Sequence, residues 1–190
     1  MWSVYFFQHR VCPAKKSDYK ATVLLGKTKE GEYHLLKTFV QQTTVKQMVQ
    51  WNYDLHNYIG EQAVVFYYME SNFLQDILFE EFVKHGNDVG WQLPIKGDSR
   101  SKPDKFQRIE SMQPLFERGL FFFNEKEKNT PDMQKLIEQL LLFEKGSRMH
   151  DDGPDAIEGA IWMLNFKTRI DHPIIMGKRG VGNYLNKHRI

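Results

Sequence analysis

The sequence predicts an α/β fold in which a mixed β-sheet carries helices on both faces. The first 40 residues contain three segments rich in aromatic and β-branched residues, separated by turns, which is typical of an antiparallel meander. Beyond them, short apolar segments alternate with segments of helical periodicity, which indicates parallel strands joined by helices. The nearly continuous apolar run at 63–69 has the composition of a central strand that is covered on both faces.

The N-terminal half contains the meander and one well-marked helix. The strands of the meander are expected at 2–8, 19–26 and 33–40, and the last two are joined by a turn around Gly31. Thr44 is a candidate N-cap for the helix that follows, and Gly60 ends that helix. Its apolar stripe at helical spacing comprises Val45, Met48, Val49, Asn52, Leu55 and Ile59.

The second half alternates helices with short strands. After the central strand we expect a helix with Phe73, Leu74, Ile77, Leu78 and Phe82 on its inner face. The next expected elements are a strand at 91–95, a polar loop at 96–104, a helix at 105–119, a strand at 120–123 and a helix from 131. Pro114 should kink or split the helix at 105–119, whereas Thr130 and Pro131 are favourable at the start of the last one.

Composition indicates a single globular domain. We expect it to span residues 1–167 of the 190, followed at 168–190 by a basic tail that contains glycine. The net charge of +2 creates no strong overall attraction for nucleic acid. The single cysteine, Cys12, excludes an internal disulfide and fits a reducing compartment. The apolar N-terminus is too short for a membrane span, so no membrane association is expected. No phosphate-loop motif of an ATPase is present in these residues.

Three carboxylates surround the start of one expected helix, within the segment 148–164. Asp151, Asp152 and Asp155 lie there, and Pro154 places the helix start near Gly153. The expected buried face of this helix comprises Ala156, Ile157, Ala160, Ile161 and Leu164. Capping is the ordinary role of aspartate at a helix start, but three carboxylates exceed what a cap needs. Because like charges repel unless a cation lies among them, a divalent metal bound through oxygen is the simplest functional explanation.

A fourth carboxylate, Glu70, directly follows the expected central strand. In open α/β sheets, binding sites lie at the carboxyl ends of central strands, although a solvated loop residue is an equally ordinary explanation for Glu70. The acidic residues at the start of the other helix favour the interpretation that Glu70 shares a metal site with them. Two-metal hydrolysis of phosphodiesters needs several carboxylates that converge on ions about 4 Å apart.

The chain resembles the C-terminal nuclease domain of the large terminase subunit of tailed bacteriophages and prophages. The segments that carry this resemblance are KKSDYKATVLLG at 15–26, YYMESNFLQD at 67–76, KFQRIESMQPLFERGLFFF at 105–123 and HDDGPDAIEGA at 150–160. The resemblance implies a ribonuclease H-like fold and two-metal cleavage of concatemeric viral DNA with Mg²⁺ or Mn²⁺. It implies that Glu70 is the middle acidic ligand and that Asp151 and Asp152 are the C-terminal acidic pair. By the same resemblance Asp155 is a weaker candidate, either as a further metal ligand or as a residue that only caps or orients.

The sequence departs from the family at the end of the first strand, where the family has an aspartate. Gln8 or His9 stands in that region, and Gln8 cannot supply a negative charge. A neutral His9 could bind a metal, and Asp18 is a second candidate substitute. The departure leaves open a degenerate, non-catalytic module that binds DNA or a packaging partner. A junction resolvase of the same fold is the other alternative, and it would prefer branched DNA.

A basic segment is the candidate DNA-binding surface. Its cations are Lys96, Arg100, Lys102, Lys105 and Arg108, of which the last three are the predicted phosphate ligands. Asp98 and Asp104 dilute this charge, so a solvated loop is the competing interpretation. The tail adds Lys178, Arg179, Lys187, His188 and Arg189. We therefore expect double-stranded DNA as the partner, with the small terminase subunit and the portal as further partners implied by the resemblance, in the cytoplasm of a bacterial host.

Overall fold

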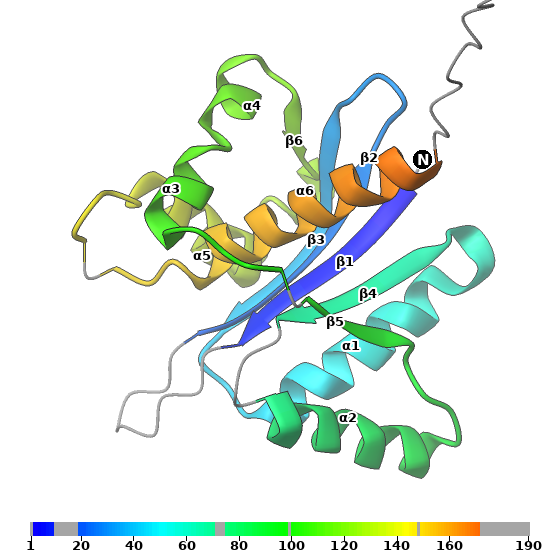
Figure 1. Ribbon diagram of the computed structural model, residues 1–190. Helices are drawn as coiled ribbons and strands as arrows, with labels where there is room; N and C mark the ends of the chain where they lie inside the picture. The colour runs from blue at the N-terminus through cyan, green and yellow to red at the C-terminus, as the bar shows by residue number, and fades with distance from the viewer. Residues whose placement is uncertain (1, 10–18, 71–74, 99, 148, 172–190) are drawn as a thin grey trace, which may run out of the picture.

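The computed structural model describes residues 2–9, 19–70, 75–98, 100–147 and 149–171 (Figure 1). Within these residues one six-stranded sheet has the strand order β5-β4-β1-β2-β3-β6. Its strands are β1 (Trp2–His9), β2 (Lys20–Lys27), β3 (Tyr33–Gln41), β4 (Val65–Glu70), β5 (Ile95–Asp98) and β6 (Phe121–Phe123). β1, β2 and β3 pair antiparallel, whereas β4 and β5 are parallel to β1 and β6 is parallel to β3. The predicted mixed sheet, with an antiparallel first part and parallel strands after it, is confirmed.

Helices cover both faces of the sheet, as predicted (Figure 1). The helices are α1 (Val45–Ile59), α2 (Gln75–Val89), α3 (Lys105–Glu110), α4 (Gln113–Glu117), α5 (Pro131–Leu141) and α6 (Asp152–Asp171). Short 3₁₀ turns lie at Gly60–Gln62 and Glu125–Glu127. Alternate residues of β2 enter two separate cores: Val23 and Leu25 pack with α5 and α6, whereas Leu24 packs with α1 and α2.

Local sequence signals explain where the helices begin. Thr44 forms a capping box with Gln47 at the start of α1, and the Thr130 hydroxyl accepts a hydrogen bond from Met133 N at the start of α5. Pro114 lies in the first turn of α4, so the predicted helix at 105–119 is split into α3 and α4 as expected.

The start of α6 is fixed by close packing against α5. Gly153 N donates to Gln139 Oε1 at 2.8 Å, and a Cβ at position 153 would lie 2.5 Å from Leu136 Cδ1. Glycine is therefore needed here for the close approach of the two helices. The predicted inner face of α6, Ala156, Ile157, Ala160, Ile161 and Leu164, is buried in the core. The acidic residues at the start of α6 consequently have a fixed position relative to the sheet.

The strand predicted at 91–95 is wrong, because β5 comprises Ile95–Asp98 and takes up residues that were expected in a polar loop. The apolar residues before it pack elsewhere: Leu93 is buried in the core of α1 and α2, and the Trp91 ring contacts Tyr53. Strand β5 forms instead by backbone pairing with β4, from Ile95 opposite Tyr67 to Asp98 opposite Glu70. Strand β5 lies at the edge of the sheet, where a strand of polar composition is tolerated.

Some predictions extend to residues that the structure describes only in part. Helix α6 continues to Asp171, past the boundary at residue 167 that was expected for the domain, and the rest of the tail lies outside the described residues. On α2, Leu78 and Phe82 are buried as predicted, whereas Phe73 and Leu74 lie outside the described residues. No helix in the described part of the chain has the length and apolar character that a membrane crossing requires.

Candidate functional site

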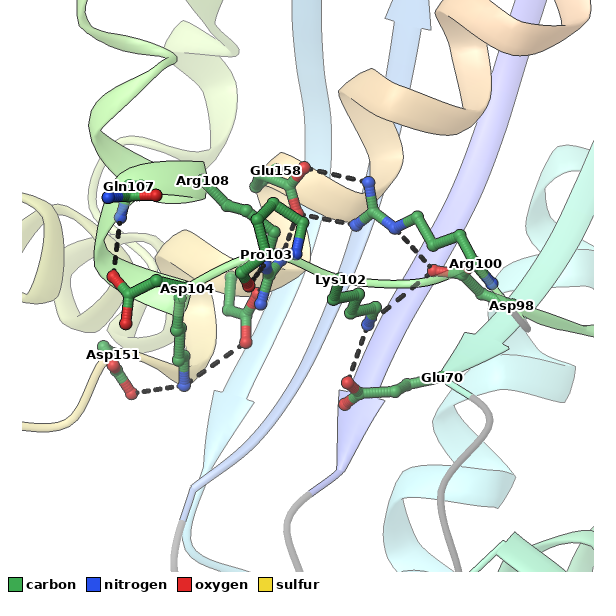
Figure 2. Close-up of polar contacts among 12 residues, drawn as sticks. Glu70, Asp98, Arg100, Lys102, Pro103, Asp104, Gln107, Arg108, Asp151 and Glu158 are labelled. Carbon is green, nitrogen blue, oxygen red and sulfur yellow. Dashed lines mark hydrogen bonds and ion pairs between the residues drawn. The ribbon is translucent and has the colours of Figure 1, made fainter.

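Two carboxylates lie side by side at the edge of the sheet. Glu70 ends β4 and Asp98 ends β5, and the two residues are direct partners in the register of these parallel strands. Figure 2 shows the Lys102 ammonium beside both: Nζ lies 2.6 Å from Glu70 Oε1 and 3.7 Å from Asp98 Oδ2. The strand end predicted to position Glu70 therefore lies beside a second acid, and Lys102 offsets part of the charge of the two.

Asp98 is a site residue that sequence reasoning missed. It is 2% exposed, and its carboxylate accepts hydrogen bonds from Arg100 N at 3.1 Å and from Arg100 Nε at 3.0 Å. A buried carboxylate needs such charged or hydrogen-bonding partners. The only available signal was an acid in a polar segment, and that segment was expected to be a loop.

The start of α6 carries the second group of carboxylates. Lys105 Nζ lies 2.6 Å from Asp151 Oδ1 and 3.2 Å from Asp155 Oδ2. Burial alone would lower the pKa of the Lys105 ammonium, but Asp155 and then Asp151 outweigh burial and raise that pKa above its ordinary value. Asp155 also pairs with Arg108, whose Nη1 is 2.9 Å from Asp155 Oδ1. Lys105 is therefore held in its charged form between two carboxylates.

Glu158, one turn further along α6, is the other acid that was missed. Arg100 binds it through two hydrogen bonds, Nη1 to Oε1 at 2.9 Å and Nη2 to Oε2 at 2.6 Å, and Arg108 Nη1 also contacts Oε2. Asp151, Asp155 and Glu158 are separated by four and three residues and so share one face of the helix. That spacing was visible in the sequence and could have revealed Glu158.

These contacts form one continuous ion-pair network from the sheet edge to the start of α6 (Figure 2). In order along the network, its members are Glu70, Lys102, Asp98, Arg100, Glu158, Arg108, Asp155, Lys105 and Asp151. The predicted site residues Glu70, Asp151 and Asp155, which are far apart in sequence, therefore belong to one connected cluster. Every cation of this ion-pair network comes from the segment between β5 and the end of α3.

Asp152, the third predicted acid of α6, lies beside this cluster. It is 3% exposed, and its Oδ2 is 3.9 Å from Nδ1 of His150. The His150 ring in turn makes an edge contact with Tyr19, with ring centroids 4.8 Å apart. The role of Asp152 as a metal ligand stays a prediction.

The end of the first strand lies beside Glu70 in the sheet. Phe7 of β1 is paired with Met69 of β4, so the next residues along these parallel strands are Gln8 and Glu70. His9 is the last residue of β1, and Asp18 lies outside the described residues. Position 8 is therefore the place in the sheet where an acid would be a neighbour of Glu70.

The donor atoms at this site suit a divalent cation, but cationic side chains already neutralise them. Among the described residues, no group of three or more His, Cys, Asp or Glu side chains is arranged to hold a metal ion. Instead, two carboxylate pairs each surround an ammonium: Glu70 and Asp98 around Lys102, and Asp151 and Asp155 around Lys105. Carboxylate oxygens are the ligands that hard divalent cations prefer, and each ammonium stands in for such a cation. The residues fit a metal provided that the lysines withdraw.

The predicted phosphate ligands turn their charges toward these acids. The side chain of Arg108 is 7% exposed, whereas those of Lys102 and Lys105 are 15% and 27% exposed. Their binding to DNA stays a prediction. The exposures favour the two lysines over Arg108 as groups that can reach an external phosphate.

Comparison of the sequence with protein-family models and with curated proteins finds no match. Solved structures are similar, however. The human cytomegalovirus terminase nuclease domain matches with a TM-score of 0.62 and 13% identity, over 89% of this chain and 87% of that chain. The large terminase nuclease from the thermophilic phage G20c matches with a TM-score of 0.54 and 16% identity, over 84% of this chain and 80% of that one.

Two further matches extend this comparison. The large terminase of bacteriophage HK97 has a TM-score of 0.57 and 11% identity over 85% of this chain, which spans 39% of the HK97 chain. A manganese-soaked structure of the cytomegalovirus domain matches with a TM-score of 0.54 and 14% identity, over 88% of this chain and 84% of that one. The chain thus has the ribonuclease H-like fold of terminase nuclease domains, and the predicted resemblance is confirmed at the level of the fold.

Proposed function

We propose that this chain is the metal-dependent endonuclease domain of a viral genome-packaging terminase and that it cuts concatemeric DNA. The observation that carries the proposal is the continuous network that joins Glu70 and Asp98, at neighbouring strand ends, to Asp151 and Asp155 at the start of α6. Metal-assisted phosphodiester hydrolysis requires several carboxylates near its ions, and this network links acids at the ends of β4 and β5 with acids at the start of α6. The fold shared with terminase nuclease domains supports the choice of substrate.

Each group of acids has a separate role in this proposal. Glu70 and Asp98 would hold one Mg²⁺ or Mn²⁺, and Asp151 and Asp152, with Asp155, would hold a second. Bound divalent cations supply an activated water and stabilise the leaving oxygen. The carboxylates would bind these cations and orient them, while Lys102 and Lys105 would neutralise phosphate charge on the DNA. The manganese-soaked cytomegalovirus domain supports divalent cations as the cofactor.

The arginines of the network keep these two groups of acids in a fixed relation. Arg100 bridges Asp98 of β5 and Glu158 of α6, and its guanidinium lies 4.7 Å from the ring centre of Trp162. Arg108 pairs with both Asp155 and Glu158. Because planar guanidinium groups form rigid two-point contacts with carboxylates, this clamp orders the segment that carries the lysines. Such rigidity is what a catalytic site needs to hold several ligands in position.

A non-catalytic binding module is the second candidate, and two observations favour it. The resemblance implies an acid at the end of the first strand, where this chain has Gln8 and His9, and a lysine ammonium occupies each carboxylate pair. Under either candidate, double-stranded DNA is the proposed partner. The small terminase subunit, the portal and a location in the cytoplasm of a bacterial host belong to the terminase proposal.

Cleavage of supercoiled plasmid tests the proposal. The purified chain should nick or cut the plasmid with Mn²⁺ or Mg²⁺ and should be inactive in chelator. Glu70→Gln and Asp152→Asn should abolish cutting, whereas Glu61→Gln, an exposed glutamate outside the site, should not. Cutting that persists in chelator or in both site variants would refute the metal mechanism. Binding of plasmid without any cutting would favour the binding module, and a preference for branched DNA would favour a junction resolvase.

A further inference from the structure

We propose that Lys102 and Lys105 are exchangeable counter-ions, which neutralise the site's carboxylates until divalent cations replace them and then bind DNA phosphates. This inference rests on the proposed function and concerns its regulation. It predicts that metal binding and DNA binding assist each other, because the same ammonium groups serve the carboxylates in one state and the phosphates in the other.

The network contains two kinds of cation, and their surroundings differ. Arg100 and Arg108 are 8% and 7% exposed and each contacts two carboxylates, so they form a buried clamp. Lys102 and Lys105 are 15% and 27% exposed and reach the acids through single ammonium groups. A lysine is a flexible point charge with rotatable donors, whereas arginine is committed to a fixed geometry. The lysines can therefore leave while the clamp stays in place.

Each lysine lies between the two carboxylates that a metal would need. Lys102 Nζ is within 3.7 Å of both Glu70 and Asp98, and Lys105 Nζ is within 3.2 Å of both Asp151 and Asp155. An ammonium and a metal ion cannot occupy the same position between two carboxylates. Without either of them the carboxylates would repel each other, because like charges at this separation are unfavourable. The lysines thus stabilise the metal-free site and compete with the metal.

Displacement of the lysines has a consequence for DNA. Once a divalent cation has taken its place, a displaced ammonium has lost its carboxylate partners and is free to pair with a phosphate at the mouth of the site. Metal binding therefore makes two cations available to DNA, and bound DNA stabilises the state in which the carboxylates accept metal. By thermodynamic linkage, the metal must strengthen DNA binding by the same factor by which DNA strengthens metal binding.

Titration of Mn²⁺ in the absence of DNA tests the competition. Binding can be followed by the electron paramagnetic resonance signal of free Mn²⁺ in the wild type, Lys102→Met, Lys105→Met and Lys128→Met. Lys128 is exposed and lies outside the network, so its variant controls for the loss of one positive charge. We expect Lys102→Met and Lys105→Met to bind Mn²⁺ about tenfold more tightly than the control. Each variant removes one charge-assisted hydrogen bond from the metal-free site, and such a bond contributes a free energy of about that factor in affinity. Equal or weaker affinity in both variants would overturn the inference.

A second measurement needs no variant and so does not depend on the folding of one. Duplex DNA affinity of the wild type is measured with and without Ca²⁺, a divalent cation that generally supports binding without cutting. We expect Ca²⁺ to tighten DNA binding, and we expect the double variant Lys102→Met/Lys105→Met to lose that gain. Wild-type DNA affinity that is independent of Ca²⁺ would contradict the coupling.

The two proposals fail in different ways. If the wild type and both lysine variants bind no Mn²⁺, the proposed metal-dependent function fails and the exchange fails with it. If all of them bind Mn²⁺ equally and the plasmid is cut, the function stands and only the exchange is refuted. Binding of Mn²⁺ by the variants alone would support the exchange and would also explain a weakly active wild type.

Discussion

Glu70 and Asp98 end neighbouring parallel strands in register, and the ammonium of Lys102 contacts both of their carboxylates. The pairing makes Asp98 a neighbour of the acid that the family resemblance identifies, although Asp98 lies in a segment of polar composition. A carboxylate that shares a cation with Glu70 should also share a metal with it. Asp98 thus enters the account on the basis of geometry alone.

Loss of the Asp98 charge should impair the site as severely as loss of the Glu70 charge. We expect Asp98→Asn and Glu70→Gln each to weaken Mn²⁺ binding by at least about tenfold, since each removes a negative ligand. Calorimetric titration measures the affinity, and circular dichroism verifies that the variants are folded. Asp88→Asn, at an exposed aspartate of α2, is the control. Normal Mn²⁺ affinity in folded Asp98→Asn would remove Asp98 from the site.

The clamp formed by Arg100 and Glu158 should contribute to the stability of the fold. Arg100→Met should lower the free energy of unfolding by roughly 3 kcal/mol, because it leaves buried carboxylates short of a partner. Urea denaturation measures this loss, and Arg118→Met, at an exposed arginine, is the control. A double-mutant cycle with Glu158→Gln should give a coupling energy above about 1 kcal/mol. Strict additivity of the two changes would show that the contact contributes little.

An aspartate introduced at the end of β1 should strengthen metal binding at position 8 but not at position 9. Position 8 directly follows Phe7, which is paired with Met69, so we expect it beside Glu70. Because successive strand residues alternate between the faces of a sheet, we expect position 9 to lie on the opposite face. Gln8→Asp should therefore tighten Mn²⁺ binding and raise the cutting rate, whereas His9→Asp should change neither. Calorimetry and plasmid cleavage provide the two measurements. An improvement in His9→Asp alone would mean that the register does not position the missing acid.

The salt dependence of DNA binding should identify Lys105 as a residue that contacts a DNA phosphate. With Ca²⁺ present, Lys105→Glu should weaken duplex binding and reduce the slope of log affinity against log salt by about 0.9, the value for one phosphate contact. Lys128→Glu, outside the network, should leave the slope almost unchanged. The measurement is a fluorescence-anisotropy titration at several salt concentrations. An unaltered slope in Lys105→Glu would exclude a phosphate contact at that residue.

Most elements of the fold could be predicted because their signals are local. The caps at Thr44 and Thr130, the break at Pro114 and the apolar spacing of α6 all depend on neighbouring residues. Strand β5 could not be predicted, because it is created by pairing with the β4 backbone. Its four residues include a lysine, a glycine and an aspartate, which have low strand propensity.

The candidate site could be predicted only in part, because some of its acids have local signals whereas others depend on contacts with distant residues. The network acids Glu70, Asp151 and Asp155 could be predicted from their places at a strand end and a helix start, whereas a site role for Asp152 stays a prediction. Glu158 was overlooked because glutamate is rarely buried, and only the distant Arg100 and Arg108 make its burial possible. The lysines were assigned to DNA because the sequence does not reveal which carboxylates will face them.

Anomalous diffraction from a crystal soaked in Mn²⁺ shows whether these carboxylates bind metal in place of the lysines. We expect anomalous peaks about 2.2 Å from carboxylate oxygens of Glu70 and Asp98, and from those of the acids at the start of α6, Asp151, Asp152 or Asp155. We also expect the ammonium groups of Lys102 and Lys105 to have moved away from these carboxylates. The absence of manganese at these acids in a fully soaked crystal, with Lys102 still paired with Glu70 and Lys105 still paired with Asp151, would contradict this proposal.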